Sequence, residues 1–113
     1  RRACRTRLKA MVAAEIEKRG PRLDPEEIRM GLEVAVYVRQ ENATLLREAF
    51  PGEADLERAA VLFDRASGDY QAVLSALDDG LTSQEEADQA ASSLRDAAAA
   101  EREVGEIFLA RGQ

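Results

Sequence analysis

The sequence of 113 residues contains no histidine, and this absence excludes more chemistry than any residue that is present. Without an imidazole there is no phosphorelay by His, no Ser–His or Cys–His nucleophilic pair, no haem ligation by His and no Glu-x-x-His di-iron site. A P-loop, a Gly-x-Gly-x-x-Gly motif and a cluster of cysteines are also missing. We therefore predict that the protein is not an enzyme, and we expect no catalytic residues, no cofactor and no metal site.

Cysteine occurs once, at Cys4, so no disulfide can form within the chain. The neighbouring Arg2, Arg5 and Arg7 would favour the thiolate form of Cys4, which a reactive cysteine needs. However, Cys4 falls on the apolar register of its segment, where a free cysteine behaves as a small hydrophobic residue. Because neither a resolving cysteine nor a base accompanies it, we interpret Cys4 as a packing residue.

Long hydrophobic runs are absent, and none approaches the roughly eighteen apolar residues that cross a bilayer, so we predict no membrane span. Hydrophobic residues make up 45% of the chain, but 21 of its residues are alanine, so larger side chains are few in any core. The first residue is Arg1 rather than Met, which fits a processed chain or a piece of a longer one. The sequence leaves the localisation of the protein open.

Net positive charge is confined to one end of an otherwise acidic chain. Residues 1–22 carry eight Arg or Lys against Glu15 and Glu17, a local charge of +6. Residues 23–113 carry eight Arg against twenty Asp or Glu, a charge of −12, which gives the net charge of −6. Because an acidic surface repels nucleic acid and anionic lipid, any contact with a polyanion would fall to the basic arm of residues 1–9.

Four helices are predicted from apolar residues spaced three and four apart, over residues 2–19, 24–50, 53–79 and 83–111. Gly20-Pro21, Pro51-Gly52 and Gly80 end the first three. Because the three connections are short, neighbouring helices should be antiparallel. We therefore predict an all-α protein in which residues 1–113 form a single domain, an antiparallel up-down-up-down four-helix bundle with a short first helix.

Local signals place several helix ends. Asp24 followed by Pro25 is typical of an N-cap and the first helical residue. Thr82 and Glu85 are spaced as a capping box, with Thr82 as the N-cap of the last helix. Gly68 interrupts the helical propensity of residues 53–79, but the apolar stripe keeps its phase across it, so we predict one continuous helix.

The packing faces give more specific expectations. Leu46 and Phe63 are predicted to belong to one shared core, with Tyr70 beside them and its hydroxyl at the rim. Arg39 falls at the edge of an apolar arc and has two interpretations. It either extends its guanidinium to solvent over an apolar stem, or forms a buried pair with a carboxylate, Glu15 or Glu101 being the candidates.

The predicted function is that of a non-catalytic helical interaction module, a small accessory or assembly subunit that docks on a larger protein complex. Partner contact is predicted to combine the basic arm with apolar positions off the main stripe of the last helix: Arg2, Arg5, Arg7, Lys9, Ile107 and Leu109. The alternative is a nucleic-acid-associated regulator that uses the basic arm. No aromatic residue for base stacking precedes Tyr37, which makes this the weaker interpretation. A homo-oligomer is compatible with the sequence.

Overall fold

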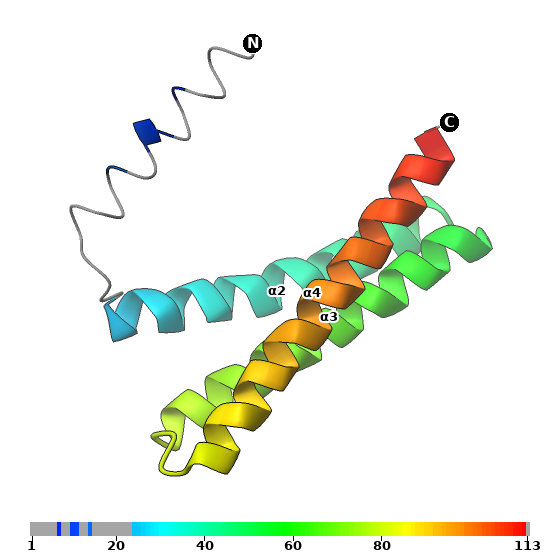
Figure 1. Cartoon of the computed structure of the whole chain (residues 1–113). Helices are drawn as coiled ribbons and strands as arrows, with labels where there is room; N and C mark the ends of the chain where they lie inside the picture. The colour runs from blue at the N-terminus through cyan, green and yellow to red at the C-terminus, as the bar shows by residue number, and fades with distance from the viewer. Residues whose placement is uncertain (1–6, 8–9, 12–13, 15–23, 113) are drawn as a thin grey trace.

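The computed structural model describes residues 7, 10–11, 14 and 24–112 (Figure 1). Within residues 24–112 the chain forms three long helices: α2 (Pro25–Ala49), α3 (Ala54–Asp78) and α4 (Gln84–Gly112). The positions described before residue 24 are helical as well. The part of the chain that the structure describes contains no β-strand, so the all-α prediction is confirmed.

The central helix of the arrangement is α3, because α2 and α4 both pack their backbones closely against it. Each of these two helices is antiparallel to α3, so α2 and α4 run in the same direction. Figure 1 shows their N-terminal halves separating, α2 running to one side while α4 follows α3. No close backbone contact joins α2 to α4 in the described residues. The three helices therefore form an open assembly rather than a closed bundle.

The predicted four-helix bundle is wrong: within the described residues 24–112 the chain forms three helices, and they do not close into a bundle. Nearly all of the predicted first helix, residues 2–19, lies outside the described residues. Met11, which its spacing assigned to the core, is described and is 62% exposed. Periodic spacing predicts an amphipathic helix, but the tertiary contact that would bury its apolar face is not encoded in the spacing.

The helix ends follow local chemistry. The Glu26 backbone N–H donates to Asp24 Oδ1 at 3.0 Å, which confirms the predicted N-cap of α2. Gly80 has a φ of +93°, a left-handed conformation that glycine adopts without steric cost, and it follows the end of α3. The prediction that α3 continues through Gly68 is also confirmed.

The capping box of α4 was predicted one residue too early. The Glu86 N–H donates to Ser83 Oγ at 3.1 Å, while the Thr82 N–H donates to the Glu86 carboxylate at 2.9 Å. Glu86 therefore serves as the returning carboxylate in place of the predicted Glu85. The run Thr82-Ser83-Gln84-Glu85-Glu86 contains two overlapping capping-box spacings, and spacing alone does not choose between them.

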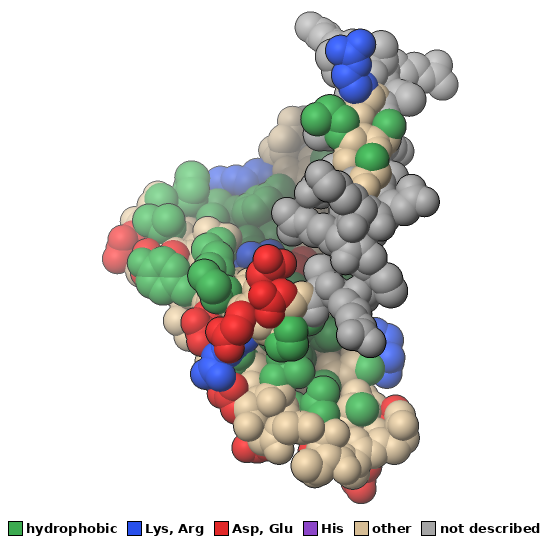
Figure 2. Space-filling model, turned by 90° about the vertical axis from the view of Figure 1, so that its left-hand side faces the viewer, with side chains coloured by type: hydrophobic (Ala, Val, Ile, Leu, Met, Phe, Trp, Pro, Cys, Tyr) green, Lys and Arg blue, Asp and Glu red, His purple; other side chains and the backbone are tan. Residues whose placement is uncertain are grey.

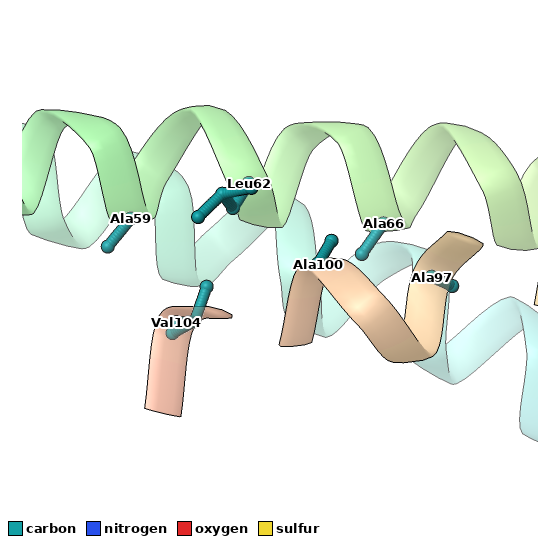
Figure 3. Close-up of a cluster of buried hydrophobic side chains, with 6 residues drawn as sticks. All are labelled: Ala59, Leu62, Ala66, Ala97, Ala100 and Val104. Atoms are coloured by element: carbon teal, nitrogen blue, oxygen red, sulfur yellow. The ribbon is translucent and has the colours of Figure 1, made fainter. Parts of the chain in front are cut away.

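The core is small and rich in alanine (Figure 3). Leu62 is the only large side chain in it with less than 2% of its surface exposed. Leu46, Phe63 and Tyr70 are partly buried against this cluster, in agreement with their predicted shared core. Small side chains allow α3 and α4 to approach closely, but they bury little apolar area. The cluster comes from α3 and α4 alone: Ala59, Leu62, Ala66, Ala97, Ala100 and Val104.

Candidate protein-binding surface

A polar cluster of three side chains joins the three helices. Arg39 Nε on α2 donates to Glu101 Oε1 on α4 at 2.5 Å. The hydroxyl of Tyr70, on α3, donates to Glu101 Oε2 at 2.7 Å. The Arg39 guanidinium also lies over the Tyr70 ring, 5.6 Å from its centroid. Both oxygens of the Glu101 carboxylate are thus engaged, one by a cation and one by a phenol.

Of the two interpretations of Arg39, the structure shows the pair with Glu101. The side chains of Arg39 and Glu101 are 29% and 28% exposed, so the pair is half-buried. Burial, followed by the hydrogen bond to Glu101, raises the pKa of Tyr70 above its ordinary value. A phenol held in its neutral form and a carboxylate already bound by two donors are poor candidates for a base or a nucleophile. The cluster is therefore a structural link from α2 to α4.

An apolar groove lies where the C-terminal parts of α2 and α4 meet over α3. It has a volume of about 320 Å³. The Phe63 and Phe108 rings lie within it at a centroid distance of 6.5 Å, tilted by 45°. Several of the lining side chains remain open to solvent, since Leu45 is 57% exposed, Phe50 44% and Phe108 42%. The full lining comprises Asn42, Leu45, Leu46, Ala49, Phe50, Phe63 and Phe108.

A row of exposed apolar side chains also lies along α2 before this groove, with Glu41 between Tyr37 and Leu45. Met30, Val34 and Tyr37 are 61%, 58% and 63% exposed, and with Leu45 they lie on one side of the helix at about 100° per residue. The opposite side of α2 carries Ala43, which is fully buried. Figure 2 shows hydrophobic side chains lying open on the molecular surface among acidic and basic ones. We name this row together with the groove the open face.

The arginines of α2 do not lie on the open face. Arg29 pairs with Asp78 of α3 at 2.7 Å and with Glu33 at 3.3 Å. Arg47 pairs with Asp64 at 2.8 Å and with Glu57, both on α3. With Arg39 bound to Glu101, every cationic side chain of α2 is turned toward a neighbouring helix.

Asp69 is a second feature that departs from ordinary surface chemistry. Its Oδ2 atom is buried and has no hydrogen-bond partner among the described residues. Burial, and then the nearby negative charge of Asp96, raise the pKa of Asp69, while Arg65 opposes the shift. The carboxyl thus destabilises the contact of α3 with α4 when it is ionised.

Two further hollows flank the C-terminal end of α3. The first, of about 350 Å³, lies between the start of α2 and the end of α3. The second, of about 380 Å³, lies between the end of α3 and the start of α4. Neither contains a nucleophile paired with a base. Among residues 7, 10–11, 14 and 24–112, no group of three or more acidic, Cys or His side chains is placed to hold a metal ion. No helix in the same described residues is long and apolar enough to cross a membrane.

The residues predicted to bind a partner have different positions. Arg2, Arg5 and Lys9 lie outside the described residues, while Arg7 is described and exposed. Leu109 is 70% exposed on the last turns of α4. Ile107 is partly buried against the core cluster, so it contributes to the fold.

Sequence reasoning missed most of the open face. Its signal was visible: the segment Val34–Val38 is apolar around most of the helix, a pattern that predicts a helix covered on two sides. The structure covers α2 on the side facing α3 and leaves Val34 and Tyr37 exposed. The second cover that this pattern predicts is not provided by α3 or α4.

Comparison of the chain with protein-family models, with curated proteins and with solved structures finds no significant match.

Proposed function

We propose that this protein is a non-catalytic interaction module that docks on a larger protein through its open face. The observation that carries the proposal is the partly exposed aromatic groove, together with the exposed apolar side chains that precede it on α2. Exposed apolar surface of this kind is costly in water and is typical of binding sites. Leu45 belongs to both parts, so one partner could cover them together.

The composition of the groove fits a protein partner. Three phenylalanines and two leucines line it, with Asn42 as the one polar side chain. Aromatic residues are enriched at the centres of protein interfaces, where a few buried anchors supply most of the affinity. The Arg39–Glu101–Tyr70 link lies outside the groove lining but joins the two helices, α2 and α4, that form the walls of the groove.

The N-terminal arm has a separate part in the proposal. Its positive charge would steer the encounter with an acidic region of the partner, while burial at the open face would supply most of the affinity. Replacing Arg2, Arg5 and Arg7 by Ser should then slow association and flatten its dependence on salt. Replacing Leu109 by Ser should instead speed dissociation if the last turn of α4 contacts the partner.

Gel filtration of a native extract tests the proposal. The chain has a mass of 12.4 kDa, and we expect it to elute in a complex well above that mass. Nuclease treatment should leave the complex intact. Elution as a free chain would contradict the proposal, and a complex that nuclease dissolves would favour the nucleic-acid alternative. In that case affinity should also fall steeply with salt, because counterions are released on binding.

A further inference from the structure

We propose that the open face binds an amphipathic helix of a protein partner, and that this helix carries basic residues beside its apolar stripe. The inference rests on the proposed function and names the chemistry of the partner.

The shape of the groove fits a helix. α2 and α4 run in the same direction, and the floor between their C-terminal parts is made by Phe63 and Leu46. The groove has a volume of about 320 Å³ and is open to solvent, since Leu45 and Phe108 are 57% and 42% exposed. It has room for large apolar side chains inserted from one turn of a docking helix. Binding of this kind uses anchors spaced three, four and seven residues apart.

The charge beside the groove selects the partner. Glu41 and Glu48 precede and follow Leu45 by four and three residues, so they lie along the same exposed side of α2. Neither glutamate has an ion-pair or hydrogen-bond partner among the described residues. The nearest arginine in sequence, Arg47, is held by Asp64 and Glu57 on the α3 side. Arg111 lies over the Phe50 ring at the groove, but its guanidinium is already paired with Glu53 and Asp55. The open face therefore presents two carboxylates that no described residue pairs with, and basic residues on the docking helix would complement them.

The same charges disfavour other occupants. A second copy that paired its α2 with this α2 would place Glu41 and Glu48 near their equivalents, because an isologous contact brings the same patch together twice. Like charges brought together across an interface cost free energy. Phosphate groups of nucleic acid or lipid would be repelled by the same two carboxylates.

Fluorescence anisotropy with synthetic peptides tests the inference. The probe is an amphipathic helix of about five turns (~18 residues), with Leu at positions three and four apart and Arg on both sides of that stripe. Its matched control has each Arg replaced by Glu. We expect the basic peptide to bind at least ten times more tightly than the acidic one at low salt. Equal binding of the two peptides would overturn the inference.

Three variants of the whole chain locate the binding. Leu45→Ser should weaken binding of the basic peptide at least tenfold, and the double variant Glu41→Lys with Glu48→Lys should weaken it several-fold. The matched control is Val61→Ser, because Val61 is 36% exposed and lies about 180° around α3 from Tyr70, away from the groove. It should bind within twofold of the unaltered chain. Circular dichroism checks that each variant is folded; Leu45 is already 57% exposed, so its substitution should leave the fold intact.

The remaining outcomes identify a different occupant. Tighter binding of a peptide with the sequence of residues 2–19, lost in Leu45→Ser, would show that the chain's own N-terminal segment fills the groove. Dimerisation that Leu45→Ser abolishes would show a second copy there. Either result overturns the inference. A large native complex that survives Leu45→Ser would reject the open face as the binding site, and would leave only the coarser claim that the chain docks on a larger protein.

Discussion

Arg39 and Glu101 are 62 residues apart in the sequence, yet their side chains meet at 2.5 Å and join α2 to α4. These two helices have no close backbone contact in the described residues. The Tyr70 hydroxyl donates to the other oxygen of the Glu101 carboxylate. The Arg39–Glu101 pair is therefore the main polar connection between α2 and α4 in the described residues. It sets how far apart the two walls of the groove stand.

A double-mutant cycle measures this link. Arg39→Met and Glu101→Gln should each destabilise the fold by about 1–2 kcal/mol, because each leaves a half-buried partner without its bond. The double variant should lose about 1 kcal/mol less than the sum of the two, since the same interaction is removed twice. Urea unfolding provides the values. Strictly additive losses would show that the pair contributes no coupling.

The small core makes one residue especially important. Leu62→Ala should cost about 2–5 kcal/mol, because Leu62 is 1% exposed and the cavity left behind cannot collapse fully. Leu109→Ala is the control, since Leu109 is 70% exposed, and it should change the free energy of unfolding by less than about 0.5 kcal/mol. Similar losses for the two variants in urea unfolding would contradict the described core.

Asp69 should make stability depend on pH. Because the pKa of Asp69 is raised in the folded protein, the folded state binds the proton more tightly than the unfolded state. The resulting stabilisation is complete below the unfolded pKa and is lost as the pH rises through the folded pKa. Asp69→Asn should remove this dependence, and near neutral pH it should be more stable than the unaltered chain.

Thermal melts from about pH 3.5 to 7.5 test the pH dependence. The difference between Asp69→Asn and the unaltered chain should grow as the pH rises. Asp96→Asn is a second comparison. It removes the negative charge that, after burial, raises the pKa of Asp69, so it should reduce the dependence of the melting temperature on pH only in part. Parallel pH profiles for the unaltered chain and Asp69→Asn would show that Asp69 titrates normally.

The continuity of α3 gives a stabilising prediction. A Cβ added at Gly68 would meet no atom within 4 Å, so Gly68→Ala should stabilise the helix by about 0.5–1 kcal/mol. Gly80→Ala should do the opposite, because its φ of +93° strains any residue with a side chain. Chemical denaturation of the two variants tests both predictions. A loss of stability in Gly68→Ala would indicate that α3 bends at residue 68.

The sequence contained much of the local structure. The N-cap at Asp24, the stop at Gly80 and the continuity through Gly68 depend on neighbouring residues, and all three are confirmed. The partial burial of Leu46 and Phe63 against one cluster was also predictable, because helical period assigns them to inward faces.

Tertiary arrangement was less accessible to sequence reasoning. Alanine side chains bury little apolar area, so an alanine-rich stripe marks the inward face of a helix only weakly. The helical period of the apolar residues therefore does not show which face of the helix a neighbour will cover. The apolar segment Val34–Val38 indicates a helix covered on two sides, but Val34 and Tyr37 are exposed. Ile107 was predicted to contact a partner and packs against the core instead. The four-helix bundle was wrong for a related reason. Short connections predict antiparallel neighbours, but they do not show that the helices close into a bundle.

The most direct test of docking through the open face is affinity capture from a native extract with three forms of the chain in parallel. The forms are the unaltered chain, Leu45→Ser combined with Phe108→Ser, and the control Val61→Ser. We predict that quantitative mass spectrometry will find a protein retained in near-stoichiometric amount by the unaltered chain and by Val61→Ser. The groove variant should retain it at least tenfold less. Equal retention of that protein by all three forms would contradict the claim that the open face is the docking surface.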